Sequence, residues 1–455
     1  MASKWPVVEL GELAAGEAGA VAIGPFGSRM KANVYSEDGV PVIRGTNIST
    51  GRWLEGDWVY IPYEFAAGLE NCLLKPGDLT FPHRGAIGEV AIVCPEHGVL
   101  MLSTSMMKFR PDSTKADSGY LFYYFRSHVG RSEILKFTSQ VGTPGIGQPL
   151  SSLRQFKVLL PPVKVQKQIA SVLGSLDDKI ELNRRMNRTL EKMAAAIFKS
   201  WFIDFDPVHA KAEGRDPNLP DEIADLFPDG FEESDLGSIP EGWQVTAVEE
   251  VAEIVKGRSY KSAELQPSDV ALVTLKSFLR GGGYREDGLK PYTGKYKPEQ
   301  VVQPGEIVVA MTDVTQNAEV IGRPAIVMPD ARHGVLVASL DTSVVRPTSD
   351  TVSTPFLYGL FSTEAFRAHT YAHSSGTTVL HLAKNAIPSF EFPCPTEQVQ
   401  RAFLSLVGPL RSRQQTMHRQ NRRLAGLRDT LLPKLLSGEI ELPEAEAVAE
   451  EVVSS

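Results

Sequence analysis

Apolar residues alternate at spacings of four and three along residues 166–201, which is the 3.5-residue period of a coiled-coil helix. Ten positions follow this spacing: Ile169, Leu173, Leu176, Ile180, Asn183, Asn187, Leu190, Ala194, Ile197 and Trp201. The spacing recurs 234 residues later at Phe403, Val407, Leu410, Gln414, Met417, Asn421, Leu424, Arg428, Leu431 and Leu435. The sequence therefore predicts two long helices with matching apolar stripes.

The two stripes are expected to face each other, because a strict 3.5-residue repeat buries only a narrow stripe against another helix. We predict an antiparallel coiled coil in which the seam amides Asn187 and Asn421 fix the register. Two ordinary amphipathic core helices are the alternative interpretation, and the ten matched positions in each copy favour the coiled coil. Because proline interrupts a helix, Gly408-Pro409 predicts that the regular part of the second helix begins near Leu410.

The repeat extends to the segments outside the helices. The stretch WPVVELGEL at residues 5–13 is echoed by WQVTAVEEV at 243–251, and the PGD turn at 76–78 is echoed by PGE at 304–306. Each copy then has a strand that ends at proline, an aromatic helix and a proline-marked entrance to the long helix. The chain is therefore expected to contain two halves built on one plan.

The predicted fold class is α+β, with two mixed α/β domains, two long helices that pair as an antiparallel coiled coil, and a pseudo-twofold internal repeat. Residues 204–240 are rich in proline and acidic residues and lack apolar periodicity, which indicates a linker. The predicted order is a first domain at 1–160, a central helix at 161–203, an acidic linker at 204–240, a second domain at 241–394, a C-terminal helix at 395–438 and an acidic disordered tail at 439–455.

The composition is that of an ordinary globular protein, with 455 residues, 42% of them hydrophobic. Cys72, Cys94 and Cys394 are an odd number without ligand-like spacing, which favours a reducing compartment and gives no sign of a structural zinc. No run of about eighteen apolar residues occurs, and the N-terminus has no apolar segment after its lysine. We expect a cytoplasmic protein that neither spans a membrane nor is exported.

The net charge of −8 argues at first against a nucleic-acid partner, but its distribution changes this interpretation. Residues 203–235 carry eleven acidic and two basic side chains, and residues 438–455 carry six glutamates without lysine or arginine. Outside these two segments the chain has a net charge of +7. A basic surface on the rest of the molecule is therefore compatible with DNA binding.

We find no motif for catalysis, which favours a binding protein. His369 and His373 have the spacing of metal ligands on a helix but lack the glutamate of HExxH, so a structural or surface role is expected. Residues 142–147 do not form a dinucleotide-binding GxGxxG, and 281–283 indicate a flexible glycine loop. The LPPV at 160–163 lacks the aspartate or asparagine and the aromatic residue of an adenine-methylation motif, and no Walker lysine motif occurs.

Over nearly its whole length the sequence resembles the specificity subunits of type I restriction-modification systems. The resemblance is carried by GPFGS at 24–28, GVPVIRGTNI at 39–48, the PGD and PGE turns, LPPxxxQ at 160–166, AIFKSWFIDFDPV at 196–208 and LRDTLLPKLLSGEI at 427–440. The second domain has KGRSY at 256–260 where GPFGS would fall, so it departs from the family pattern there. The resemblance implies two target-recognition domains that alternate with two conserved helices.

The resemblance further implies a non-catalytic subunit that gives DNA sequence specificity to an adenine-specific methyltransferase and endonuclease complex. Such a subunit binds two methyltransferase subunits and, in some systems, two restriction subunits. No cofactor is expected in this chain, since S-adenosylmethionine, ATP and Mg²⁺ belong to the partner subunits. The implied ligand is double-stranded DNA with an asymmetric, two-part target.

The candidate DNA contacts are polar residues in glycine-bounded loops, because such side chains bind phosphates and base edges. In the first domain they are Ser28, Arg29, Lys31, Arg44, Thr46, Asn47, His83, Arg84, Gln140 and Thr143, of which Arg44 ranks first because it follows an apolar strand. In the second domain they are Lys256, Arg258, Tyr260, Lys261, Lys276, Arg280, Tyr284, Thr312, Asp313, Gln316, Asn317, Ser375 and Thr377.

A coiled-coil adaptor whose two domains bind proteins is the alternative function. Salt dependence distinguishes the two, because phosphate contacts release counterions and make binding weaker as salt rises. A self-sufficient nuclease or methyltransferase would need motifs that we do not find in the sequence.

Overall fold

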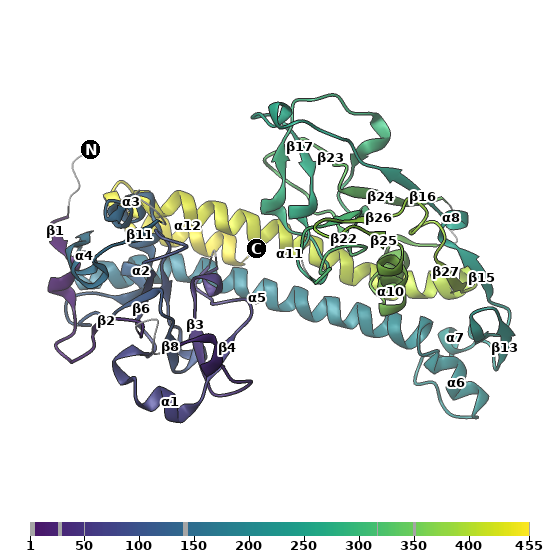
Figure 1. Ribbon diagram of the computed structural model, residues 1–455, viewed down its shortest axis with the longest axis horizontal. Coiled ribbons are helices and arrows are strands. Elements are labelled where there is room, and N and C mark those ends of the chain that lie inside the picture. Colours follow the sequence, from purple (N-terminus) through teal and green to yellow (C-terminus); the bar gives the residue numbers. More distant parts are fainter. Residues whose placement is uncertain are drawn as a thin grey trace. The chain divides into compact units, whose positions relative to one another are not determined.

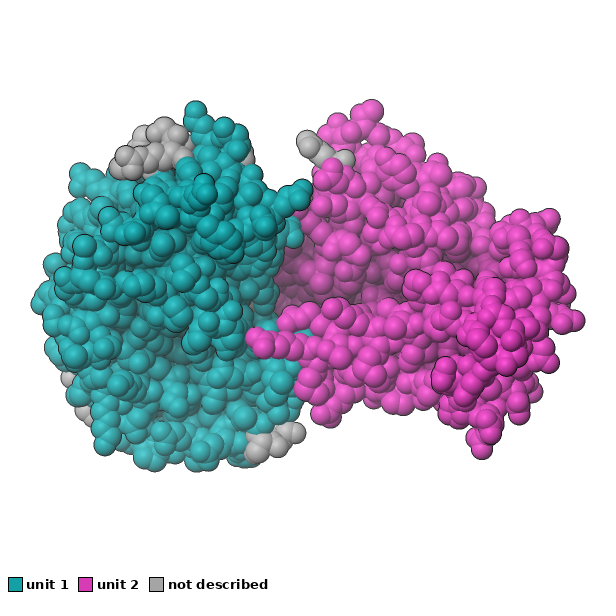
Figure 2. Space-filling view, turned by 90° about the horizontal axis from the view of Figure 1, so that it is seen from below, with its two compact units in different colours: residues 1–184, 420–455 teal, residues 185–419 magenta. Residues whose placement is uncertain are grey.

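The structure is a computed structural model that describes residues 5–25, 30–49, 51–139, 144–315, 317–348 and 352–454. The chain divides into two compact units (Figure 2). Unit 1 contains Met1–Arg184 and Gln420–Ser455, and unit 2 contains Arg185–Arg419. Each unit therefore includes a globular domain together with one part of each long helix. The predicted mixed α/β class with two long helices is confirmed.

The two long helices are α5, Val163–Phe202, and α11, Glu397–Ser437 (Figure 1). Every one of the twenty repeat positions on them is buried or half-buried. In unit 1, Asn183 on α5 donates to Asn421 on α11 at 2.8 Å. In unit 2, Gln414 on α11 donates to the backbone oxygen of Asn187 on α5 at 3.1 Å.

The helix contacts run antiparallel within each unit. In unit 1, Asn183 meets Asn421 and Asp177 meets Arg428, so the residue number falls on α5 as it rises on α11. In unit 2 the corresponding contacts join Asn187 to Gln414 and the Phe198 ring to the Phe403 ring.

The second helix does not begin near Leu410, as the glycine-proline pair suggested, but at Glu397. Proline removes one helical hydrogen bond and disturbs the preceding turn, at a cost of about 3 kcal/mol. Val399, Phe403 and Val407 are buried before Pro409, and burying one such side chain contributes about 1.5–3 kcal/mol. Their packing outweighs the cost, so the helix continues through the proline.

Unit 1 contains two four-stranded sheets, in which β3 and β8 are parallel and the other neighbours antiparallel. The first has the order β4 (Val59–Ile61), β3 (Val40–Ile43), β8 (Leu100–Leu102), β5 (Leu73–Leu74). The second has the order β2 (Val21–Ile23), β9 (Met106–Phe109), β6 (Leu79–Pro82), β7 (Ala91–Ile92). Two-stranded pairs join β1 (Val7–Glu9) to β12 (Lys157–Leu159) and β10 (Thr138–Ser139) to β11 (Gly145–Ile146).

Four short helices complete the domain of unit 1: α1 (Tyr63–Ala67), α2 (Ser118–Arg126), α3 (His128–Leu135) and α4 (Pro149–Gln155). Helix α2 starts where the Asp117 side chain accepts a hydrogen bond from the Tyr120 backbone, an N-cap that satisfies an otherwise unpaired N–H. All six residues from Tyr120 to Phe125 are buried, so this helix is covered on every side and forms the centre of the unit 1 core.

Unit 2 also contains two four-stranded sheets, with β17 and β23 parallel. One has the order β18 (Lys290–Pro291), β17 (Val270–Val273), β23 (Val335–Ala338), β19 (Val301–Val302). The other has the order β16 (Ala252–Lys256), β24 (Thr342–Pro347), β20 (Ile307–Ala310), β22 (Pro324–Ile326). Smaller sheets join β15 (Gln244–Ala247) to β27 (Glu391–Cys394), and β21 (Thr312–Asp313) to β26 (Leu380–Leu382) and β25 (Ser374–Ser375). Helices α8 (Val248–Val251), α9 (Thr354–Phe361) and α10 (Glu364–Ala372) accompany them.

Residues 204–240, predicted as an acidic linker between the domains, contain regular secondary structure. They form α6 (Asp206–Ala212), α7 (Asp221–Ala224) and a hairpin of β13 (Phe231–Ser234) with β14 (Gly237–Pro240). Val208, Phe227 and Ile239 are buried in the unit 2 core, and the Phe227 ring packs against Trp201 at 5.0 Å. Phe205, Leu219 and Phe231 pack against the same core, so apolar contacts hold the segment although its average composition is that of a linker.

The acidic tail is also ordered, contrary to its prediction, and forms α12 (Leu442–Ser454) beside α11 (Figure 1). Ala445, Ala449 and Val452 are buried in the unit 1 core together with Leu432 and Leu436 of α11. Their spacing of four and three places them on one helical face, and the glutamates occupy the remaining faces. Throughout the described residues, no helix combines the length and the hydropathy needed to cross a membrane.

Candidate nucleic-acid interface

In unit 1 the polar loops meet around the turn Ser103–Ser105, which joins β8 to β9. The Gly24 N–H donates to the Met106 oxygen at 2.9 Å, and a Cβ at Gly24 would lie only 1.7 Å from the Ser103 oxygen. Ser103 N–H donates to Ile43 at the end of β3, and His83 N–H donates to Ser105. Backbone contacts thus gather the loops after β2, β3 and β6 on one edge of the domain.

The loop after β3 is organised by Asn47. This side chain is buried; its oxygen accepts the Arg44 N–H at 3.0 Å and its amide donates to the oxygens of Glu55 and Asp57 at 3.0 and 3.2 Å. Asn47 therefore holds the loop together, since its oxygen and its amide both bond to the backbone, and its contact with DNA stays a prediction. Arg44 is half-buried and donates through Nη2 to the Asp57 oxygen at 2.5 Å.

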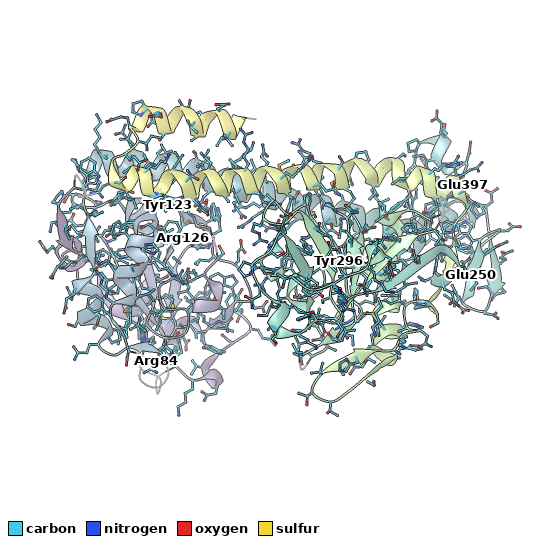
Figure 3. All side chains as sticks on the ribbon, turned by 90° about the horizontal axis from the view of Figure 1, so that it is seen from above. Arg84, Tyr123, Arg126, Glu250, Tyr296 and Glu397 are labelled. Atoms are coloured by element: carbon cyan, nitrogen blue, oxygen red, sulfur yellow. The ribbon has the colours of Figure 1, made fainter. Side chains whose placement is uncertain are left out.

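His83 is likewise buried, and its Nε2 lies 3.1 Å from the Thr104 oxygen. Burial lowers its pKa, which favours the neutral imidazole, and its predicted contact with DNA stays a prediction. The neighbouring Arg84 is exposed, and its backbone pairs with Gly145 of the β10–β11 hairpin. Figure 3 places Arg84 at the side of unit 1 remote from α11, whereas Tyr123 and Arg126 lie near α11.

Unit 2 gathers its loops around the turn Ser339–Thr342 between β23 and β24. A Cβ at Gly257 would lie 1.9 Å from the Ser339 oxygen, and the Arg258 N–H donates to the Ala338 oxygen at 2.7 Å. Ser339 N–H donates to Val273 at the end of β17, and Met311 N–H donates to Asp341. The loops after β16, β17 and β20 thus meet on one edge of this domain.

Thr312 and Asp313, two of the predicted DNA contacts, are buried and hold this edge together. Thr312 Oγ1 donates to Asp341 at 3.1 Å, and the two Asp313 oxygens accept the N–H groups of Thr315, Val320 and Ile321 at 2.6–2.9 Å. Burial opposes the charged carboxylate, but these hydrogen bonds outweigh it and lower the pKa of Asp313. Three backbone donors thus hold the Asp313 carboxylate in place inside the domain.

The remaining predicted contacts differ in exposure. Those with exposed side chains are Lys31, Thr46, Arg84, Lys256, Lys261, Lys276, Arg280, Asn317, Ser375 and Thr377. Arg44, Arg258, Tyr260 and Tyr284 are half-buried, and Lys290 donates to the Tyr260 hydroxyl at 3.3 Å. Ser28, Arg29, Gln140, Thr143 and Gln316 lie outside the described residues.

The sequence did not reveal the contacts between the loops and the long helices. Arg52 and Glu55, in the loop after β3, form ion pairs with Asp178 and Arg184 of α5, each at 3.1 Å. In unit 2, Glu286 pairs with His418 of α11. The available signal was the repeat itself, because Arg184 and His418 are separated by the same 234 residues as the heptad positions.

His369 on α10 and His373, which caps the C-terminal end of α10, both bond to the backbone. His369 Nε2 lies 2.9 Å from the Ala386 oxygen, His373 Nδ1 lies 2.8 Å from the His369 oxygen, and the two rings stack with centroids 4.2 Å apart. Among the described residues, no group of three or more histidine, cysteine, aspartate or glutamate side chains is placed to hold a metal ion.

Comparison with known proteins connects this arrangement to one family. Residues 2–192 match the type I restriction modification DNA specificity domain, Methylase_S. The chain is 25% identical over 413 residues to the type I restriction enzyme HindI specificity subunit of Haemophilus influenzae, covering 81% of this chain and 87% of the relative. It is 26% identical over 389 residues to the MjaIX specificity subunit of Methanocaldococcus jannaschii, covering 83% and 81%.

The fold is similar to that of a solved protein. The crystal structure of the type I restriction-modification S subunit from M. genitalium matches with a TM-score of 0.52 and 15% sequence identity, covering 95% of this chain and 96% of that one. At this identity the likeness concerns the fold.

Proposed function

We propose that the chain is a specificity subunit of a type I restriction-modification system, which reads an asymmetric, two-part DNA target with one recognition domain in each unit. The observation that carries this proposal is the pair of loop clusters, each assembled around the turn that follows a strand of the central parallel pair. Each cluster presents lysine, arginine and small polar side chains on one edge of its domain. Such side chains bind phosphates and base edges.

We further propose that the two units are copies in an internal repeat. Their sheets correspond strand by strand: β4-β3-β8-β5 to β18-β17-β23-β19, and β2-β9-β6-β7 to β16-β24-β20-β22. The pair β1–β12 corresponds to β15–β27. Residues 24–31 and 257–261, which follow the equivalent strands β2 and β16, differ in sequence, and this supports an unequal pair of half-sites and hence an asymmetric target.

The helices α5 and α11 are proposed to pair as an antiparallel coiled coil that scaffolds the partner subunits. The antiparallel contacts within each unit and the buried repeat positions support this arrangement. The proposed partners are two methyltransferase subunits and, where restriction occurs, two restriction subunits. The chain itself would be non-catalytic, with S-adenosylmethionine, ATP and Mg²⁺ used by those partners in adenine methylation and restriction.

The test is to express the chain with its cognate methyltransferase and to sequence the methylated DNA. The proposal predicts one asymmetric motif with two specified parts and an unspecified gap. Binding by the purified complex should weaken steeply with salt, because phosphate contacts release counterions. A complex that methylates DNA without sequence preference, or a purified chain that methylates DNA alone, would contradict the proposal.

A further inference from the structure

Each recognition domain has one loop that is bound both to the loop cluster and to a long helix. We call residues 44–57 the first reading loop and residues 274–288 the second reading loop. In the first, the Glu55 N–H donates to the Asn47 oxygen at 2.9 Å; in the second, the Arg285 N–H donates to the Ser277 oxygen at 2.9 Å. The two loops therefore close on themselves in the same way, and both begin directly after a strand of the parallel pair.

A glutamate at the closing point of each loop pairs with a basic side chain on a long helix. Glu55 Oε1 lies 3.1 Å from Arg184 Nη1 of α5 in unit 1. In unit 2 the glutamate is Glu286, the neighbour of Arg285, and it pairs with His418 of α11. Because Arg184 and His418 are 234 residues apart, the same contact is built twice at equivalent positions of the repeat.

In unit 1 a short series of hydrogen bonds connects the Glu55–Arg184 pair to Arg44, the candidate base-reading side chain. In unit 1 the Glu55 side chain binds Arg184, while the Glu55 and Asp57 oxygens accept the Asn47 amide. The Asp57 oxygen also accepts Arg44 Nη2. A second pair, Arg52 with Asp178, fixes the middle of the same loop to α5.

The second reading loop has a comparable connection. Glu286 binds His418 through its side chain, and its backbone oxygen accepts Arg332 Nη2 at 2.9 Å. Thr274 Oγ1, at the start of the loop, donates to the Gly288 oxygen at 3.0 Å. Lys276 is exposed between these fixed points, in the short helix Leu275–Ser277.

We propose that Glu55 with Arg184, and Glu286 with His418, are positioning pairs through which the long helices hold the two reading loops in their DNA-binding conformation. This inference rests on the proposed function. The pairs are partly exposed, with side-chain accessibilities of 33% and 47% in unit 1 and 23% and 24% in unit 2. Partly exposed pairs contribute little to global stability. Their effect is to order the loop before DNA binds, which reduces the entropy that binding costs.

The first measurement needs no DNA. In the full chain, Glu55→Gln should speed amide hydrogen exchange in residues 51–57 by about two- to fivefold, the range of an exposed ion pair. Glu286→Gln should do the same for residues 279–288. Glu64→Gln and Glu391→Gln, at exposed glutamates of the same domains, are the matched controls and should change neither loop.

The second measurement uses the complex with the methyltransferase and a panel of targets changed in one half-site at a time. Glu55→Gln should reduce discrimination about two- to fivefold in the half-site read by unit 1 and leave the other half-site unchanged. The charge-swapped chain, Glu55→Arg with Arg184→Glu, should restore both exchange and discrimination. His418→Arg should preserve reading by unit 2, and His418→Gln should impair it.

Restoration by the charge swap distinguishes positioning from general damage, because a misfolded loop would not recover. Unchanged exchange in both loops after the glutamate substitutions, or a charge swap that restores nothing, would overturn the inference. If the wild-type complex shows no sequence preference, the proposed function fails instead. In that case the amide hydrogen-exchange measurement still tests whether Arg184 and His418 order the two reading loops.

Discussion

Arg428 on α11 and Asp177 on α5 form an ion pair in the interior of unit 1, with Arg428 Nη1 2.6 Å from Asp177 Oδ1. The hydroxyl of Tyr123 on α2 donates to the other carboxylate oxygen at 2.8 Å. Burial, and then the charge of Asp177, raise the pKa of Tyr123, so the phenol stays protonated and remains a donor. One carboxylate thus joins both long helices to the recognition domain.

Removing Arg428 should be strongly destabilising, because it would leave the Asp177 charge buried without its cation. We expect Arg428→Met to lower the free energy of unfolding by about 3–5 kcal/mol. Chemical denaturation followed by circular dichroism measures this change. Arg413→Met, at an exposed position of the same helix, is the control and should change stability by less than about 0.5 kcal/mol. Equal effects of the two substitutions would contradict the structural importance of the pair.

Asp313→Asn should destabilise unit 2 in a pH-dependent way. The hydrogen bonds to its carboxylate lower the pKa of Asp313 in the folded chain below its ordinary value of 3.8. The charged form therefore adds stability above that value, and this contribution is lost as the pH falls through the lower, folded-state pKa. We expect a loss of about 1–3 kcal/mol at pH 7 for Asp313→Asn, measured by denaturation. The difference in unfolding free energy between Asp313→Asn and wild type should shrink as the pH is lowered toward the folded-state pKa of Asp313. The exposed Asp235→Asn should show no such trend.

Arg44→Ala and Lys261→Ala should act on separate half-sites, because they lie in the loop clusters of different units. A lost base contact should cost about 1–3 kcal/mol at one position, and a lost phosphate contact should weaken all sequences alike. Binding to targets altered one base pair at a time separates these outcomes. If either substitution changed the preference in both half-sites, independent reading by the two domains would be wrong.

The buried face of α12 predicts an unequal response to the same substitution at two nearby alanines. Ala449 is buried against the core of unit 1, whereas Ala447 is exposed. Ala449→Asp would bury a carboxylate without a partner and should lower stability by at least about 2 kcal/mol. Ala447→Asp adds the same charge and should stay within about 0.5 kcal/mol of wild type. Thermal unfolding of both variants is the measurement, and similar midpoints would show that the tail does not dock.

The length of the helix pair is predicted to set the unread gap between the two half-sites. Seven residues inserted between Ile180 and Asn187, with seven more between Gln414 and Asn421, lengthen both helices by about 10 Å. Extending both helices keeps the ion pairs on either side of the insertion in register, namely Asp177 with Arg428 and Glu191 with Arg411. About three base pairs of DNA span the same length, but they also rotate the second half-site by nearly a third of a turn. The gap should therefore lengthen by up to three base pairs. If the helix pair cannot follow the rotation, binding should fail. Sequencing of methylated sites measures the gap, and an active variant with an unchanged gap would refute this role.

The long helices could be predicted because their pattern is periodic over many residues and occurs twice. Helix α12 and the segment 204–240 could not, for opposite reasons. In α12 the buried residues Ala445, Ala449 and Val452 have helical spacing. Two of them are alanines, and six glutamates lie nearby, so the apolar periodicity of the segment is weak. In 204–240 the buried side chains are too far apart in sequence to show any period.

The sequence placed the candidate DNA contacts on loops, but it did not predict which of their side chains are buried. Arg84 and Asn47 both follow strands, yet Arg84 is exposed and Asn47 is buried with its amide bonded to the backbone. Asparagine and aspartate bind bases and backbone with the same groups, so residue type alone cannot separate the two uses. Such a side chain bonds inside the protein when a later backbone segment, such as residues 55–57 or 320–321, lies within hydrogen-bond distance of it.

The ion pairs between the long helices also determine which helix can accept which partner. In both units the acid is on α5, as Asp177 or Glu191, and the arginine is on α11, as Arg428 or Arg411. If a second copy of α5 took the place of α11 in the same register, Asp177 would stand where Arg411 stands and would face Glu191. Two copies of α11 would oppose Arg411 to Arg428 by the same offset of 234. Like charges would repel each other in both self-pairings, so the charge pattern favours an α5–α11 pair over an α5–α5 or an α11–α11 pair.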